Sequence, residues 1–288
     1  MIRRLKYNEI DFEKYSKCLE NSAQKNWYAR KEVLDQLSGN WHILVYNDYE
    51  AVMPVPLKRK FALNLVVMPL FCQQLGVFSS KDDFKINDQF LNFLKNRYNI
   101  FSYSFNHYNS FSQDLDKKKN YTIQISDYIL LRRKKYFKGR KSTAKCAQHL
   151  IYKEIDFSEE SFSFMQKNFK GLSKNGDVEK YRKYLNFLYT NNSLKLSGAY
   201  LDEKLINIAV LIDEKDQLSL LGLINDEEYK DENGPSFLID KILSLYIHEK
   251  KFNFMGSNIR GIEVFFKSFG AELQEYPTLE NKILKKFF

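Results

Sequence analysis

The residues best suited to chemistry lie close to the C-terminus. Residues 252–256 form a short aromatic run that ends in Gly256, and a glycine there permits a positive φ or a close approach of the backbone. Ser257 or Asn258 can then cap a following helix, and such a helix start leaves N–H groups for an anion or a carbonyl oxygen. Lys267 lies further along this helix, off its apolar face. From the residues alone, a helix cap, a core-facing stripe and a solvated lysine also explain the segment.

The helix after Gly256 must bury one side before it can hold Lys267 at a fixed point. Its expected apolar face has helical spacing and consists of Ile262, Phe265, Phe266 and Phe269. Gly270 is the expected C-terminal stop of this helix.

Two halves of the chain show the same order of elements. The first half predicts two helices, three strands with tight connections, a helix and a strand, at residues 12–20, 27–37, 41–46, 51–57, 63–68, 88–98 and 100–105. The second half predicts the same order at residues 159–169, 178–188, 194–200, 205–212, 218–223, 236–250 and 252–255. The offset is roughly 150 residues, which favours an internal duplication over one large α+β domain.

This element order resembles that of the GNAT fold, and the C-terminal segment narrows the resemblance. Phe252-Asn-Phe-Met-Gly-Ser257, followed by Phe266-Lys-Ser-Phe-Gly270, resembles the signature of the Fem-type aminoacyltransferases. In that family a strand reading Asp-Phe-x-Gly-Ser leads to a helix reading Phe-Lys-x-x-Phe-Gly. Asn253 stands where the family has Asp, and one residue instead of two separates Lys267 from the next Phe.

The resemblance implies an α+β fold of two tandem GNAT-like domains with mixed central sheets. We expect an N-terminal domain at 1–128, a basic connecting segment at 129–148 and a C-terminal domain at 149–288. The family places the matching lysine beside the reacting centre, so the resemblance implies a catalytic role for Lys267. Residues 69–78 also resemble a segment of related bacterial double-GNAT proteins. The substrate-binding residues expected from these matches are Gly256, Ser257, Asn258, Phe266, Gln73 and Gln74.

The acyl donor can be an aminoacyl-tRNA or an acyl-CoA, and the sequence leaves both open. A GNAT enzyme that uses acyl-CoA holds the pyrophosphate on a glycine-rich turn before the helix that follows the third strand. Here the matching turn, residues 225–236, holds five acidic residues and one glycine, and Pro235 lacks an N–H. Acids suit a helix N-terminus but repel an incoming pyrophosphate, so we expect a poor CoA site. No tightly bound cofactor is expected.

Most of the net charge of +9 comes from one run of residues. Residues 129–145 carry eight basic residues and no acid. The run reads either as a solvated linker helix or as a patch for RNA phosphates, such as those of a tRNA acceptor end. The candidate nucleic-acid-binding residues are Arg132, Arg133, Lys138, Arg140 and Lys141.

Several classes of protein are disfavoured by composition. The three cysteines and four histidines are scattered without metal-ligand or disulfide spacing, so no metal site is expected. The N-terminal residues show no secretory pattern, and the most apolar stretch, 63–72, is too short to span a bilayer. These features predict a cytoplasmic protein without a membrane span.

The leading hypothesis is transfer of an aminoacyl or acyl group to an amine acceptor. The family resemblance implies a small-molecule or peptidoglycan-precursor acceptor, as in bacterial cell-wall synthesis. The alternatives are an acyl-CoA-dependent N-acyltransferase and a catalytically inactive double-GNAT binding module. No residue in the motif is identified as a general base.

Overall fold

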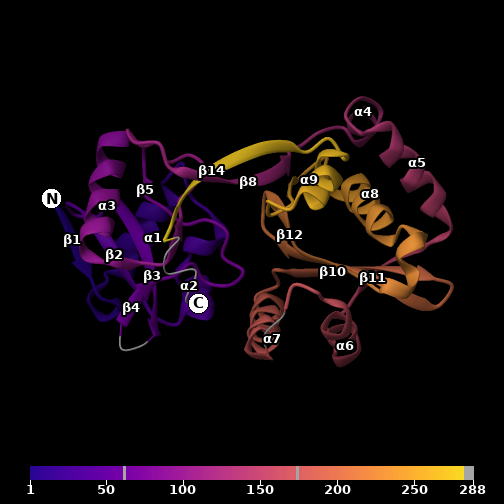
Figure 1. Ribbon diagram of the computed structural model, residues 1–288, viewed down its shortest axis with the longest axis horizontal. Coiled ribbons are helices and arrows are strands. Elements are labelled where there is room, and N and C mark those ends of the chain that lie inside the picture. Colours follow the sequence, from indigo (N-terminus) through magenta and orange to yellow (C-terminus); the bar gives the residue numbers. More distant parts are fainter. Residues whose placement is uncertain (61–62, 173–174, 282–288) are drawn as a thin grey trace. The chain divides into compact units, whose positions relative to one another are not determined.

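The computed structural model describes residues 1–60, 63–172 and 175–281 (Figure 1). The chain divides into two compact units, residues 1–119 with the segment from Gln274 onward, and Asn120–Leu273. Two strands, β8 (Asp116–Ile123) and β14 (Glu272–Glu280), each begin in one unit and end in the other.

The first unit contains a mixed sheet in the strand order β1-β2-β3-β4-β6. Neighbouring strands are antiparallel except β4 and β6, which are parallel. The short β5 pairs with β3. The elements are β1 (Ile2–Leu5), α1 (Phe12–Glu20), α2 (Lys31–Ser38), β2 (Trp41–Tyr46), β3 (Ala51–Lys60), β4 (Leu63–Val66), β5 (Phe78–Ser79), α3 (Phe84–Arg97), β6 (Asn99–Ile100) and β7 (Ser102–Ser104).

The second unit repeats this topology, with the strand order β9-β10-β11-β12-β13. Again the first three pairs are antiparallel and the last, β12 with β13, is parallel. The elements are α4 (Tyr128–Lys134), α5 (Lys138–Cys146), β9 (Ile151–Ile155), α6 (Glu159–Asn168), α7 (Asn175–Thr190), β10 (Leu194–Leu201), β11 (Lys204–Asp213), β12 (Gln217–Asn225), α8 (Gly234–Tyr246), β13 (Lys251–Asn253) and α9 (Arg260–Lys267). The predicted duplication is confirmed at the level of strand order and direction.

Two predicted elements are each divided into two shorter ones. The predicted helix 27–37 is a 3-10 turn, Trp27–Ala29, followed by α2, because Arg30 is extended between them. The predicted strand 100–105 is two short strands, because its two ends have different partners. β6 pairs with β4, whereas β7 pairs with Thr278–Glu280 of β14.

The predicted domain boundaries lie after residues 128 and 148. The two compact units have other boundaries, after residues 119 and 273. The basic segment 129–148 lies within the second unit, where it forms α4 and α5. Most of β14 belongs to the first unit, because its C-terminal end pairs with β7. Strand pairing across a long separation in sequence therefore sets the boundaries.

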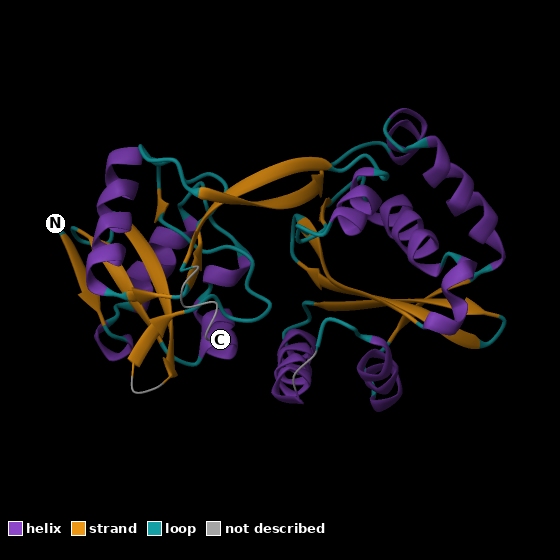
Figure 2. Ribbon diagram, viewed as in Figure 1, coloured by secondary structure: helices purple, strands orange, loops and turns teal. Residues whose placement is uncertain are grey.

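In the second unit, helices cover both faces of the sheet (Figures 1 and 2). Helices α8 and α9 lie on one face, together with α4 and α5, and helices α6 and α7 lie on the other. The core of this unit is rich in aliphatic and aromatic side chains from β11, β12, α8 and α9. None of the helices in the described ranges is long and apolar enough to cross a membrane.

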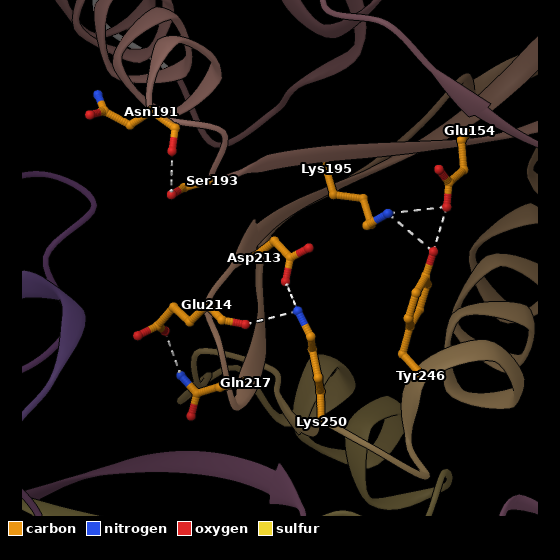
Figure 3. Close-up of polar contacts among 9 residues, drawn as sticks. All are labelled: Glu154, Asn191, Ser193, Lys195, Asp213, Glu214, Gln217, Tyr246 and Lys250. Atoms are coloured by element: carbon orange, nitrogen blue, oxygen red, sulfur yellow. Dashed lines mark hydrogen bonds and ion pairs between the residues drawn. The ribbon is translucent and has the colours of Figure 1, made fainter.

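Polar contacts hold the C-terminal end of α8 against the sheet (Figure 3). The ammonium of Lys195 lies 3.1 Å from both the Glu154 carboxylate and the Tyr246 hydroxyl. Lys250 donates to the backbone oxygen of Glu214 at 2.9 Å and also bonds Asp213. These contacts help to fix the position of α8. The N-terminal end of α8 follows β12 after the turn of residues 226–233.

Candidate functional site

The site begins where β13 ends, at two consecutive residues with left-handed backbone conformations. Met255 has φ 57° and Gly256 has φ 74°. The Asn253 side chain supports this turn, because its Oδ1 accepts a hydrogen bond from the Met255 N–H at 2.9 Å. Of the two roles that the sequence allowed for Gly256, the structure shows the positive φ. A left-handed methionine costs about 1–2 kcal/mol, and such strain concentrates at functional sites.

The residues after Gly256 do not cap α9 as predicted. The residue that precedes α9 is Ile259, which makes no side-chain cap. Ser257 instead accepts a hydrogen bond from the Ile259 N–H at 2.9 Å, which closes a local turn before the helix starts. Asn258 is exposed. The N–H groups of residues 260–262 therefore have no acceptor within the described part of the chain, and all three residues are exposed.

Lys267 lies on α9 in an ion pair with Glu263, one turn earlier. The distance from Lys267 Nζ to Glu263 Oε1 is 2.7 Å. The lysine side chain is 41% exposed, whereas that of Glu263 is 14% exposed. The ammonium also lies 5.6 Å from the ring centroid of Tyr121 on β8. Lys267 is therefore held by a neighbouring carboxylate and an aromatic ring, and stays accessible to solvent.

Only part of the predicted apolar face of α9 is buried. Phe266 and Phe269 are buried, and Phe266 stacks on Phe254 with 4.4 Å between ring centroids. Phe266 thus supports the helix next to Lys267 from the core side, and offers little surface to a substrate. Ile262 is 39% exposed, so the expectation that it is buried is wrong. Phe266 on α9 and Phe269, which follows the end of the helix, belong to the core of the second unit.

Gly270 ends this region as predicted and brings α4 against α9. Its φ is 81°, and a Cβ at this position would lie 2.5 Å from the Cβ of Lys135. Only glycine fits this contact without a shift of the backbone.

The parallel pair β12–β13 separates close to this turn. β13 pairs only with Gln217, Leu218 and Ser219 of β12. On its other side β13 pairs with β8 through Phe252 and Asn253. This contact continues past the end of β13, since the Phe254 N–H bonds the Tyr121 oxygen at 2.9 Å. β12 also carries a bulge opposite the step from Val210 to Leu211. The second half of β12 therefore has no β13 partner within the described residues, and the sheet opens there.

The acidic turn between β12 and α8 has few donors for a phosphate. Asp226 is buried and accepts a hydrogen bond from the Glu228 N–H at 3.1 Å. Among the first three residues of α8, Pro235 has no N–H, and the Ser236 N–H bonds the Asn233 oxygen at 3.0 Å. Gly234 is the remaining donor, and it is buried.

Other acids of this turn are paired with basic side chains. Glu227 lies 2.6 Å from Lys170, and Glu232 lies 2.9 Å from His149. The start of α8 therefore offers few N–H donors to a pyrophosphate. The weak CoA binding expected from the sequence stays a prediction.

The basic residues of α4 and α5 have unequal surroundings. Arg140 is engaged inside the unit, where its Nε donates to Ser268 at 2.8 Å and its guanidinium lies 4.5 Å from the Phe265 ring centroid. Burial lowers the pKa of this guanidinium. Arg132 pairs with the buried Asp240 at 3.7 Å. The guanidinium of Arg140 is therefore engaged by side chains of the second unit, which leaves it less available to bind a nucleic acid.

Two neighbouring cavities run along Arg132. One has a volume of about 570 Å³ and is lined by Tyr128, Ile129, Arg132, Arg133, Lys141, Ser142 and Lys145. The other, of about 400 Å³, shares three of these residues and reaches Asp240, Lys241 and Ser244 of α8. Both lie within the second unit and carry more basic than acidic side chains.

The predicted residues Gln73 and Gln74 belong to the first unit, whereas Lys267 belongs to the second. Gln74 is buried, and its Oε1 accepts a hydrogen bond from the His107 N–H at 2.9 Å. Its backbone oxygen accepts from Asn26 at 3.3 Å. Gln74 therefore fixes two loops of the first unit to each other.

Two acidic residues near these sites were missed from the sequence. Glu263 stands four residues before Lys267 on a predicted helix, a spacing that by itself indicates an ion pair. Asp240 is a lone acid within the apolar helix α8, and an acid in such a position has a buried partner. Among the described residues, no group of three His, Cys, Asp or Glu side chains is arranged to hold a metal ion.

Comparison with known proteins agrees with the topology. No protein-family model matches the sequence, and no curated protein matches it in sequence. Solved structures do match the fold. FemX covers 99% of this chain over 99% of its own length, with a TM-score of 0.65 and 9% identity.

Two further structures extend the comparison. A tandem GNAT protein from the clavulanic acid biosynthesis pathway covers 96% of this chain over 97% of its own, with a TM-score of 0.55 and 9% identity. The match to L-PGS from Bacillus licheniformis covers 95% of this chain and 92% of that protein, with a TM-score of 0.52 and 10% identity. The chain therefore has the tandem GNAT-like fold that FemX also has, over nearly its entire length.

Proposed function

We propose that this protein is an acyltransferase that moves an aminoacyl or acyl group from an ester or thioester to an amine. One arrangement supports the proposal above all. The strained turn at Met255 and Gly256 leads directly into α9, whose first N–H groups lack acceptors in the described part of the chain, and the same helix carries the Lys267–Glu263 pair. The fold of this chain is similar to that of FemX and to that of a tandem GNAT protein.

The N–H groups and Lys267 act on the same atom in this proposal. Attack by the amine on the carbonyl carbon gives a tetrahedral intermediate with a negative oxygen, and positioned donors stabilise it. Side chains on a helix lean toward its N-terminus, so the ammonium of Lys267 lies level with Glu263, within about one turn of the first N–H groups. The oxyanion binds between the start of α9 and this ammonium.

Glu263 completes the proton balance. The amine loses one proton when the C–N bond forms, and the leaving alcohol or thiol gains one when the C–O or C–S bond breaks. A carboxylate beside the reacting centre accepts the first proton and returns it to the leaving group. We assign this role to Glu263, which is mostly buried and already hydrogen-bonded to Lys267.

The surroundings of α8 favour an ester donor over acyl-CoA. A pyrophosphate at a helix start needs several free N–H groups, and Ser236 and Pro235 do not supply them. We therefore propose an aminoacyl-tRNA as donor, with acyl-CoA as the alternative. The acceptor class implied by the resemblance to Fem-type enzymes is a peptidoglycan precursor or another small amine.

Purified protein incubated with radiolabelled aminoacyl-tRNA, or with radiolabelled acetyl-CoA, and a panel of amines tests the proposal. We expect a labelled amide from the ester donor, formed more slowly by on the order of a hundredfold or more when Lys267→Ala protein is used. Amide formed from acetyl-CoA alone would replace the proposed donor. If neither donor binds at micromolar protein, the chain is a binding module with a GNAT-like fold.

A further inference from the structure

Helix α4 divides its side chains among three surroundings. Tyr128 and Arg132, one turn apart, both reach the buried Asp240, with the Tyr128 hydroxyl 2.8 Å from its carboxylate. Leu131 is buried next to Gly270. The remaining positions of the helix face solvent, and they are Ile129, Leu130, Arg133 and Lys134. The helix is therefore anchored on two sides and presents a fixed outer side.

The outer side of α4 continues onto the start of α5. Phe137 and Lys138, which follow the helix, are both exposed. We call the set Ile129, Leu130, Arg133, Lys134, Phe137 and Lys138 the α4–α5 face. The N–H of Phe137 bonds the Ser268 oxygen at 2.9 Å, so the backbone of this segment is held by α9.

The apolar members of the α4–α5 face are unusually exposed. Ile129 is 70% exposed, Phe137 is 52% exposed and Leu130 is 45% exposed. A single exposed apolar residue is ordinary, but here three lie within nine positions of one anchored segment. Covering these apolar side chains with an apolar phase lowers the free energy, because it removes their surface from water.

The charged members of the face are not paired with acids in the part of the chain that the structure describes. Arg133, Lys134 and Lys138 form no ion pair within residues 1–60, 63–172 and 175–281. Behind them, the cavity of about 570 Å³ adds Lys141 and Lys145, one helical turn apart on α5. The nearest acid on α4, Asp127, already accepts the Leu130 N–H as helix cap. The surface therefore favours a partner with many negative charges.

We propose that the α4–α5 face binds the surface of a phospholipid bilayer that contains anionic lipid. The basic side chains meet the phosphates, one head group enters the cavity beside Lys141 and Lys145, and the exposed apolar side chains insert between the lipids. A bilayer interface offers negative charge and an apolar layer within a few ångströms, which is what this face presents. The proposal stands independently of the acyl transfer proposed above.

RNA fits the face less well. Its backbone satisfies the cations, but isoleucine and leucine gain little from phosphates and do not stack on bases as aromatic rings do. Of the three apolar members, only Phe137 is aromatic. The guanidinium of Arg140, a predicted phosphate ligand, is engaged by Ser268 and lies over the Phe265 ring.

Flotation of the full-length protein with vesicles tests the proposal. We expect binding to vesicles of phosphatidylcholine mixed with phosphatidylglycerol, and much weaker binding to phosphatidylcholine alone. Higher salt should weaken binding, since surface charges are screened. Equal binding to both kinds of vesicle, or to neither, overturns the proposal.

Matched variants separate the contributions of charge and apolar contact. Lys134→Glu with Lys138→Glu should reduce partitioning by about tenfold or more. Lys167→Glu with Lys215→Glu, a matched pair of exposed lysines elsewhere in the second unit, should change it little. Leu130→Ser should reduce partitioning by roughly fivefold, whereas Leu245→Ser, at 43% exposure on α8, should not. Equal thermal unfolding midpoints establish that the variants are folded.

Insertion and RNA binding provide the deciding measurements. In an Ile129→Trp variant, the fluorescence of the new tryptophan should shift to shorter wavelength with anionic vesicles, over the background of the buried Trp27 and Trp41. If the variant protein binds tRNA at the same salt but shows neither flotation nor a spectral shift, the face is an RNA surface and the proposal fails.

Discussion

Lys267 and Glu263 form an ion pair one turn apart on α9, with 2.7 Å between the ammonium nitrogen and the carboxylate oxygen. The pair joins the cation expected to stabilise an oxyanion to the carboxylate expected to accept a proton. An i,i+4 pair on an exposed helix contributes only a few tenths of a kcal/mol to stability. A large effect of either residue on turnover would therefore be chemical in origin.

Lys267→Ala should reduce the rate of amide formation by on the order of a hundredfold or more, because one oxyanion donor is lost. Lys267→Arg should restore part of it, since charge returns with a different geometry. Single-turnover kinetics measure the effect. Lys183→Ala is the matched control, because Lys183 forms a similar i,i+4 pair with Glu179 at 2.8 Å on α7. Equal losses in both variants would contradict a catalytic role for Lys267.

Glu263→Gln should slow turnover by about a hundredfold. It should also make the rate depend more steeply on the basicity of the attacking amine, because no protein group then accepts the amine's proton. Glutamine keeps a hydrogen-bond acceptor for Lys267 but cannot take up the amine's proton. Measuring the pH–rate profile with amines of different basicity checks this. An unchanged profile would show that Glu263 only positions the lysine.

The start of α8 should bind CoA weakly. We expect no saturation by CoA at micromolar concentrations in isothermal titration calorimetry of the native protein. Glu227→Gln with Glu228→Gln should improve binding modestly, and more at low salt, because two like charges are removed. Glu159→Gln with Glu160→Gln removes two acids from the start of α6 and should have no effect. Tight CoA binding by the native protein would restore acyl-CoA as the donor.

The buried carboxylate of Asp240 should be important for the stability of the second unit. It is 4% exposed and binds the Tyr128 hydroxyl and the Arg132 guanidinium. Asp240→Ala leaves these groups without their partner and should lower the free energy of unfolding by about 3 kcal/mol. The double variant Asp240→Leu with Arg132→Leu should recover much of the loss. Urea unfolding measures both, and a neutral Asp240→Ala would show that the pair is dispensable.

The first unit should lose stability in acid through Asp35. Its carboxylate accepts hydrogen bonds from Trp41, Tyr7 and Lys31, at 2.9, 2.9 and 2.7 Å. Burial alone would raise the pKa of Asp35, but these hydrogen bonds outweigh burial and lower it from 3.8. A lowered folded-state pKa means that the stabilisation is full above the unfolded-state value and is lost as pH falls through the folded-state value.

Thermal unfolding followed by Trp41 fluorescence, in a Trp27→Phe background, checks this dependence. Asp35→Asn should lower the midpoint at neutral pH and flatten its decline below about pH 4. At the other extreme, the hydrogen bond to Asp35 raises the pKa of Lys31 to about 12. That contribution is present below pH 10.5 and should be lost as pH rises through about 12. A decline in acid that is identical in both proteins would assign it to other groups.

Much of the fold could be predicted from local patterns in the sequence. The helix 12–20 and the strand 41–46 have the predicted bounds, because their apolar spacing and the cap at Asp11 act within a few residues. Gly256 has a positive φ, one of the two roles that the sequence allowed, and Gly270 follows the helix as its predicted stop, since a positive φ is a property of one residue and its immediate neighbours. The repeated order of elements likewise predicted the repeated sheet topology.

What only the tertiary structure decided concerns partners far apart in sequence. The side of α9 that is buried depends on what packs against it, so Phe266 lies in the core while Ile262 faces solvent. Arg140 is one of eight similar basic residues in sequence, and its contacts with Ser268 and Phe265, which half-bury it, could not be predicted from that run. The predicted cap at Ser257 or Asn258 was wrong because Ser257 closes a turn before the helix begins. Amino-acid patterns specify local backbone and periodicity, whereas burial, pairing and charge compensation arise from contacts that form only when distant segments meet.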